Sequence, residues 1–164
     1  MVKVKRALNQ LLSIAVAVLL AFMTLLTIYQ VIMRYFLKNP STISEDLLSY
    51  SFVWVSLLGT ALVFGQRGHM NMSFLPDKLK GTPKLTLEIL SEVLIMIIVA
   101  LVFLFGGSEF MEVGMMQLSP TLNISMNWVY IILPLSGILI IIYNIINLYE
   151  TIRKYSLEGK ENYQ

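Results

Sequence analysis

The sequence contains no cysteine and a single histidine, His69. Without cysteine, the chain cannot form disulfides, thiolate metal sites or thiol–disulfide exchange centres. One histidine cannot supply the paired axial ligands that a four-helix haem-binding membrane cytochrome uses. An enzyme would need a nucleophile with a neighbouring base, or a metal cluster. We therefore expect no enzymatic activity, no catalytic or metal-binding residues and no cofactor.

Charged residues are also scarce. Asp, Glu, Lys and Arg make up 13% of the chain, whereas a soluble domain usually carries about 25%. The net charge of +2 is too small to indicate a nucleic-acid partner. Mean hydropathy is +0.74 and 57% of the residues are hydrophobic, which is typical of a membrane protein.

Four long apolar stretches fill most of the 164 residues: 8–33, 47–66, 89–113 and 126–149. A helix of about 20 apolar residues matches the hydrocarbon thickness of a bilayer, and it satisfies its backbone hydrogen bonds within one segment. The sequence therefore predicts an all-α integral membrane protein, with four transmembrane helices at about 8–33, 45–66, 84–113 and 126–149. They would form a single membrane domain over 1–164, with a short cytoplasmic tail at 151–164. The alternative, a soluble helical bundle, needs polar helix faces, and positions 11–33 have none.

The basic residues predict the orientation. Ten of the twelve Lys and Arg residues lie on the side that would hold both termini, and only Arg34 and Lys38 lie on the other. The positive-inside rule makes the richer side cytoplasmic, so we expect both termini inside the cell. The first apolar run is too long for a signal peptide and is interpreted as a retained helix.

Polar residues mark the turn between the first two predicted spans. Arg34 ends the first span beside Tyr35 and Phe36, a pattern typical of a membrane–water boundary. Ser41 or Ser44 can cap the second helix, which places Glu45 and Asp46 in its first turn, where the helix dipole favours acids. Capping is one interpretation of these two acids, and contact with a partner is the other.

Aromatic and small residues suggest packing positions in the second and fourth spans. Trp54 and Gly59 lie within the second span, where small residues let helices approach closely. Trp128 and Tyr130 open the fourth span as an interfacial aromatic pair. Pro134 follows early in that helix and should kink it.

Acidic residues stand at both ends of the third span, Glu88 and Glu92 at one end and Glu109 and Glu112 at the other. At 1.5 Å per residue of α-helix, Glu92 and Glu109 are about 25 Å apart, close to the apolar thickness of a bilayer. We therefore expect them to reach opposite membrane interfaces, where they would anchor the helix or contact a partner. The central thirds of all four spans lack Asp, Glu, Lys, Arg and His. Because transport pathways usually place such residues at depth, we expect the chain to pack against a partner and not to transport alone.

Two groups of motifs resemble the small membrane subunit of tripartite ATP-independent periplasmic (TRAP) transporters. The first comprises Arg34-Tyr35-Phe36, Ser44-Glu45-Asp46, Trp54, Leu58-Gly59-Thr60-Ala61 and Arg67-Gly68-His69-Met70. The second comprises Ser119-Pro120-Thr121-Leu122, Trp128-Val129-Tyr130 and Leu133-Pro134. Three positions depart from the family pattern: Ile43 where tryptophan is frequent, Asp46 where glutamate is usual, and Ser125 where proline is frequent.

The resemblance implies a heterodimer in the bacterial inner membrane. A large elevator-type membrane subunit would carry the sodium and substrate sites, and this small subunit would extend its static scaffold. A periplasmic binding protein would deliver an organic acid, such as a C4-dicarboxylate or sialic acid, and the sequence does not choose between them. The candidate contacts with the partner or with membrane lipid are Arg34, Glu45, Asp46, Trp54, Gly59, Arg67, His69, Trp128, Tyr130 and Pro134.

Two other hypotheses stay open. The chain could form an independent homo-oligomeric transporter or channel, with Gln30, Asn144 and Asn147 lining a path. It could instead be a membrane assembly factor. Arg67 and His69 would have the simpler role of reaching lipid headgroups on any of these hypotheses.

Overall fold

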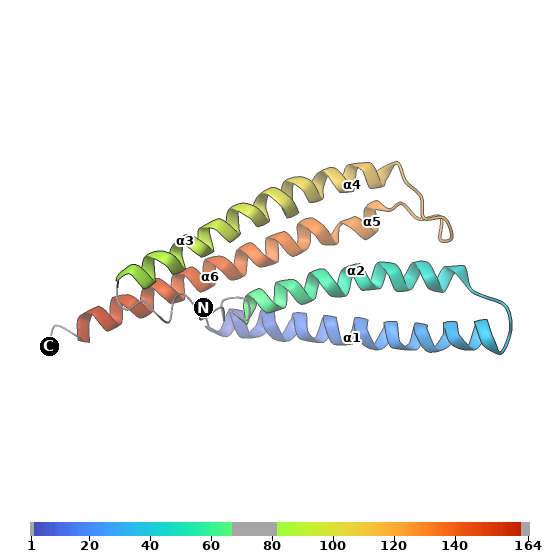
Figure 1. The fold of residues 1–164 in the computed structure, drawn as a ribbon, viewed down its shortest axis with the longest axis horizontal. Helices are drawn as coiled ribbons and strands as arrows, with labels where there is room; N and C mark the ends of the chain where they lie inside the picture. The colour runs from blue at the N-terminus through green and yellow to red at the C-terminus, as the bar shows by residue number, and fades with distance from the viewer. Residues whose placement is uncertain (1, 67–81, 162–164) are drawn as a thin grey trace.

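The computed structural model describes residues 2–66 and 82–161. Its helices are α1 (Val2–Tyr35), α2 (Thr42–Gly65), α3 (Thr82–Val99), η2 (Ala100–Gly106), α4 (Gly107–Met115), α5 (Asn127–Tyr130) and α6 (Ile132–Glu161) (Figure 1). Between α4 and α5, Leu118 and Ser125 form an isolated antiparallel bridge that closes the connecting loop.

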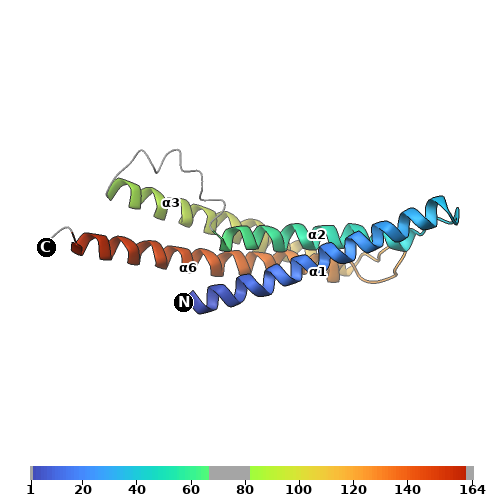
Figure 2. The same ribbon diagram turned by 90° about the horizontal axis from the view of Figure 1, so that it is seen from below.

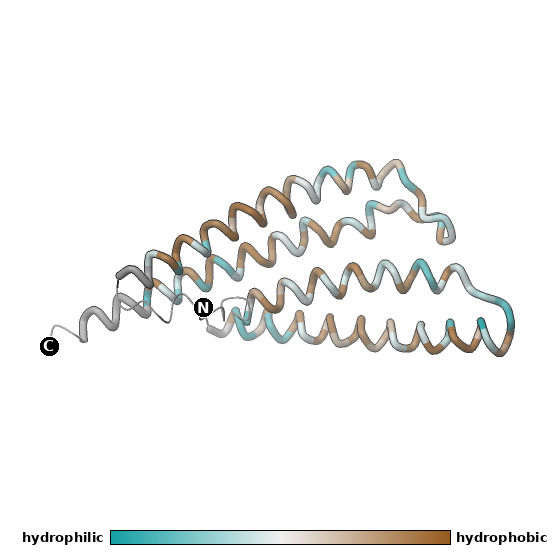
Figure 3. Tube along the Cα trace, in the orientation of Figure 1, coloured by the Kyte–Doolittle hydropathy of each residue, from teal (hydrophilic) through white to brown (hydrophobic). Residues whose placement is uncertain are grey.

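Four helical segments are long and apolar enough to cross a membrane: Val4–Tyr35, Thr42–Gly65, Thr86–Met115 and Asn127–Arg153. The third joins α3, η2 and α4, and the fourth joins α5 to most of α6. Figure 3 shows hydrophobic residues along all four, and a hydrophilic turn between α1 and α2. The predicted all-α fold with four spans is confirmed for the described part of the chain.

The spans follow one another in the order α1, α2, α6 and α3–α4, as Figure 1 shows. Helix α1 packs on α2, α2 packs on α6, and α6 packs on α3 and η2. Figure 2, turned by 90°, shows α1 crossing α2 and α6 at an angle. The chain is thus a layer about one helix thick, with α1 and α3 at opposite edges. The fourth span, which joins α5 to most of α6, is the most buried: 39% of its most apolar stretch is buried, against 6% to 11% for the other three spans.

Helix α2 packs through a seven-residue repeat. Ser44, Ser51, Leu58 and Gly65 are buried along one face. Seven residues make about two turns of an α-helix, so these positions lie in one row. The small side chains in this row let α2 lie close to its neighbours.

The third span carries the same kind of row with one extra residue. Glu92, Val99, Gly107 and Gly114 are its buried positions within the described residues, and the spacing is seven, then eight, then seven. The longer interval contains η2, a π-helix over Ala100–Gly106. A π-helix has more residues per turn than an α-helix, so it absorbs the extra residue and keeps Gly107 and Gly114 on the packed face. The regular α-helix that we expected for this span was therefore wrong in its middle.

The fourth span is interrupted at Ile131, between α5 and α6. Pro134 follows in the first turn of α6, and it has no N–H to donate to the carbonyl of Tyr130. Gly107 lies opposite this point: a Cβ added there would be 3.0 Å from Leu133 Cβ and 3.2 Å from Pro134 Cδ. The kink predicted at Pro134 therefore lies opposite the end of η2 in the neighbouring span.

Candidate functional sites

A polar group at one end of the layer ties α2 to the loop between α4 and α5. We call Asp46, Tyr50, Ser119 and Thr121 the outer clasp. Ser119 Oγ donates to Asp46 Oδ2 at 2.9 Å, and Thr121 Oγ1 donates to the same oxygen. Tyr50 Oη donates to Ser119 Oγ at 2.9 Å. Ser119 is almost completely buried, so the outer clasp is part of the packed interior and not a set of surface contacts.

The outer clasp changes the interpretation of the predicted helix cap. Ser41 occupies the N-cap position of α2 but makes no side-chain capping bond, and Ser44 Oγ donates to the Ser41 carbonyl at 2.7 Å. Glu45 lies exposed in the first turn, where its charge still suits the helix dipole. Asp46 instead holds a loop more than 70 residues further along the chain.

Three of the predicted contact residues pack inside the chain. Trp54 Nε1 donates to the Val129 carbonyl at 3.2 Å, which joins α2 to α5. Tyr130 meets Phe110 edge to face, with ring centroids 5.9 Å apart. Pro134 packs against Gly107, as described above. The structure therefore gives these three residues intramolecular partners, which the sequence did not reveal.

The other predicted contact residues are more accessible. Trp128 is 68% exposed, and Arg34 in the last turn of α1 is also exposed. Gly59 has no atom within 4 Å of the position that a Cβ would take. Arg67 and His69 lie outside the described residues.

A second polar group lies at the opposite end of the layer. We call Lys5, Asn147 and Glu150, with the carbonyl of Phe64, the inner polar cluster. Lys5 Nζ donates to Asn147 Oδ1 at 2.8 Å and pairs with Glu150 Oε2 at 3.1 Å. Asn147 Nδ2 donates to the Phe64 carbonyl at 3.1 Å. The cluster joins the N-terminal end of α1 and the C-terminal end of α2 to α6.

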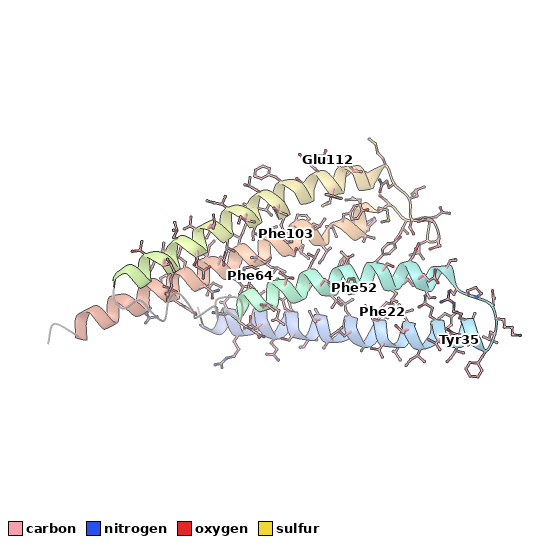
Figure 4. All side chains as sticks on the ribbon, viewed as in Figure 1. Phe22, Tyr35, Phe52, Phe64, Phe103 and Glu112 are labelled. Carbon is pink, nitrogen blue, oxygen red and sulfur yellow. The ribbon has the colours of Figure 1, made fainter. Side chains whose placement is uncertain are left out.

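Glu92, which we expected at a membrane interface, packs inside the helix layer and does not face its surface. Glu92 is 1% exposed and lies in the buried row with Val99 and Gly107. That row faces α6, which runs antiparallel: a Cβ on Gly137 would be 2.7 Å from Phe103 Cβ. Continued along the two helices, this register places Glu92 level with the buried polar residues of α6 between Asn144 and Thr151. A buried carboxylate needs polar or charged groups beside it. Glu109 and Glu112 are both exposed, and Figure 4 shows Glu112 at the far end of the third span.

The two asparagines proposed to line a path are both completely buried in the helix layer. Both the oxygen and the nitrogen of the Asn147 amide form hydrogen bonds within the inner polar cluster. Gln30 is half-buried on α1, near the other end. The three residues therefore do not line a common path within the chain.

Apolar side chains cover both broad faces of the layer. Phe22 and Phe52, marked in Figure 4, are 41% and 62% exposed. A groove of about 400 Å³ on α1 and α2 is lined by Met23, Leu48, Ser49, Phe52 and Val53. Such surfaces need lipid or a protein partner to cover them. Among the described residues, no group of three or more His, Cys, Asp or Glu side chains could hold a metal ion.

The outer clasp and the inner polar cluster use their polar side chains to join helices. Together with the four apolar helical segments, this defines a small multi-pass helical membrane protein. The sequence model of the tripartite ATP-independent periplasmic transporters, DctQ component, matches residues 23–154, and the chain belongs to this family. It is 26% identical over 137 residues to the sialic acid TRAP transporter small permease protein SiaQ of Vibrio cholerae, covering 84% of this chain and 79% of that protein. It is 25% identical over 132 residues to a putative TRAP transporter small permease protein of Haemophilus influenzae, covering 80% and 81%.

Proposed function

We propose that this chain is the scaffold subunit of a sodium-coupled organic-acid importer in a bacterial inner membrane. It pairs with a large elevator-type membrane subunit, and a periplasmic binding protein delivers the substrate. Both termini lie in the cytoplasm, which puts the inner polar cluster on the cytoplasmic side and the outer clasp on the periplasmic side. The count of basic residues at the two ends supports this orientation.

The observation that carries the proposal is the open layer of helices. Neighbouring spans pack in a row, and the edge helices α1 and α3 do not close on each other (Figure 1). A row of this kind encloses no central channel between the described helices, and it leaves two wide apolar faces for a partner and for lipid. This shape fits a rigid scaffold against which a second subunit moves.

The two polar groups support the same role. The outer clasp and the inner polar cluster each join helices that are distant in the sequence, one at each end of the layer. Hydrogen bonds at both ends hold the spans in a fixed arrangement. A static scaffold needs such fixed geometry more than a subunit that moves during transport.

We place the contact with the large subunit on the exposed face of α2 around Gly59. The space beside Gly59 is open, and Ser56 and Thr60 next to it are also small and exposed. Small residues let a helix of another chain approach the backbone. Arg34, Glu45 and Trp128 would contact the partner, the binding protein or lipid headgroups at the periplasmic end, and Arg67 and His69 would do so at the cytoplasmic end.

Replacing Gly59 by tryptophan tests this surface. The large ring would hold the partner helix away, so recovery of the large subunit with the tagged chain should fall about tenfold, the effect of losing about 1.4 kcal/mol of binding. Gly59→Ala is the matched control and should copurify nearly as wild type. Co-purification from detergent extract is the measurement, and unchanged recovery with tryptophan would remove Gly59 from the interface.

Reconstitution tests the function itself. In proteoliposomes with a sodium gradient, this chain with its large subunit and binding protein should take up the organic acid, and the chain alone should not. Sialic acid is the first substrate to try, because the Vibrio cholerae relative is named for it, followed by C4-dicarboxylates. Uptake by the chain alone would refute the scaffold role and favour a homo-oligomeric transporter. A stable soluble partner in place of a multi-span one would favour an assembly factor.

A further inference from the structure

A groove lies between α1 and α2, in the half of the layer that contains their turn. The α1 residues that pack on the apolar core lie between Leu8 and Leu19, and the groove of about 400 Å³ lies beyond them, beside Met23. Helix α1 also crosses α2 at an angle (Figure 2). The two helices therefore share the core near the end of α2 and leave the groove open closer to their turn.

The walls of this groove suit a hydrocarbon chain. Its one polar side chain is that of Ser49, whose Oγ donates to a backbone carbonyl of the preceding turn at 2.9 Å. A polar ligand would therefore find little to bind. A helix of another chain fits poorly as well, because close approach of helices needs small residues and Phe52 stands 62% exposed in the wall. The apolar residues of the groove are Met23, Leu48, Phe52 and Val53.

Arg34 lies above the groove on the same face of α1. It stands eleven residues after Met23, which is three turns and about 20° more, or about 16 Å along the helix. One leaflet contributes half of the hydrocarbon core, about 15 Å. A phospholipid with its headgroup at Arg34 would therefore extend an acyl chain as far as Met23. Lys38, in the turn, lies beyond the end of α1 and further from the groove.

Glu45 lies above the groove on α2. It precedes Leu48 by three residues and Phe52 by seven, so it shares their face of the helix. Arg34 and Glu45 are both exposed, and neither forms an ion pair with another residue in the described ranges. The neighbouring acid, Asp46, is bonded within the outer clasp. The groove is thus headed by one cation from α1 and one anion from α2.

We propose that the groove binds one molecule of phosphatidylethanolamine. Arg34 pairs with the phosphate, because a guanidinium presents a fork of N–H donors to phosphate oxygens. Glu45 accepts hydrogen bonds from the ammonium group of ethanolamine, and one acyl chain lies along Met23 and Phe52. Phosphatidylglycerol has no amine for Glu45, and the trimethylammonium group of phosphatidylcholine has no N–H to donate. The site uses residues of this chain alone, so it does not rest on the proposed function.

Native mass spectrometry of the full-length chain tests the headgroup. The chain is purified in detergent and incubated with equal amounts of phosphatidylethanolamine, phosphatidylcholine and phosphatidylglycerol that carry the same acyl chains. The one-lipid complex with phosphatidylethanolamine should be about three- to fivefold more abundant than the others, the effect of one exposed ion pair. Glu45→Gln should lower it to the level of phosphatidylcholine. Equal retention of the three lipids by the wild-type chain would overturn the proposal.

Arg34→Gln should weaken the binding of all three lipids by about three- to fivefold, because each contains the phosphate. Arg6→Gln is the matched control: Arg6 is also exposed on α1 but lies near its other end, so lipid retention should stay at the wild-type level. Equal losses in the two variants would show that Arg34 attracts phospholipid only as part of the overall charge, and would remove it from the site.

Val53→Trp tests the groove itself, because the large ring would fill the space of the acyl chain. Retention of phosphatidylethanolamine should fall about fivefold. Val63→Trp is the control, since Val53 and Val63 are both in α2, with exposures of 38% and 47%, and only Val53 lines the groove. Unchanged lipid retention in Val53→Trp would overturn the site. If that variant instead lost a dimer of the chain, or recovery of the large subunit, a second copy or the partner would occupy the groove in place of lipid.

Discussion

Gly65→Ala is expected to lower the free energy of unfolding by about 2–3 kcal/mol, the upper range for overpacking a tight core. The added methyl group would lie 2.5 and 2.6 Å from two ring carbons of Tyr143, where a real Cβ cannot be accommodated. Tyr143 is completely buried, so its ring has no free space to enter without moving α6. Steric trapping, which monitors reversible unfolding in bicelles, would measure the change in the free energy of unfolding.

Gly59→Ala is the matched control for this prediction. Both glycines lie in α2, but the methyl group on Gly59 would meet no atom within 4 Å. Alanine favours a helix over glycine by about 0.5–1 kcal/mol, so the control should be neutral or slightly more stable. Equal stabilities of the two variants would show that α2 does not contact α6 as closely as the structure has it.

The four spans were predictable because each depends on local composition. A run of about 20 apolar residues has few options other than a transmembrane helix, and the sequence contains four such runs. The turn residues around Pro40 and the start of α2 near Thr42 were also local signals. The prediction of packing was less complete, because contacts between spans depend on which face of each helix is turned inward.

The roles of Asp46 and Glu92 show where the sequence was insufficient. An acid in the first turn of a helix is adequately explained by the helix dipole, so nothing indicated that Asp46 would bind Ser119 and Thr121. Glu92 stands near the end of an apolar run, and its distance of about 25 Å from Glu109 along the helix indicated an interfacial position. Only the register of the third span against α6, whose Asn144 and Asn147 are buried, makes a buried position reasonable.

The π-helix was hidden for a different reason. In α2, the buried row contains two serines and a glycine among larger apolar residues, so its seven-residue spacing can be read from the sequence. In the third span, Val99 is surrounded by Ile97, Ile98 and Ala100, and any of these could equally have been the buried one. Apolar content alone therefore does not reveal that the row skips one residue.

Deleting Val102 should be tolerated, because it would make the spacing of Glu92, Val99, Gly107 and Gly114 seven throughout. The span would then be a regular α-helix with the same face buried, and stability should change by about 1 kcal/mol or less. Val102 is 58% exposed, so its own contacts inside the chain are few.

Deleting Ile97, which is 52% exposed, is the matched comparison and should be severe. The spacing between Glu92 and Val99 would become six, which turns the two residues by about 100° relative to each other. Either Glu92 would face lipid or the glycines would leave α5 and α6, and a charged group that faces lipid is unfavourable. Unfolding free energies of the two deletion variants under the same conditions decide the matter. If ΔVal102 is as damaging as ΔIle97, η2 has a role other than absorbing one residue, since both deletions remove an exposed apolar side chain and shorten the span equally.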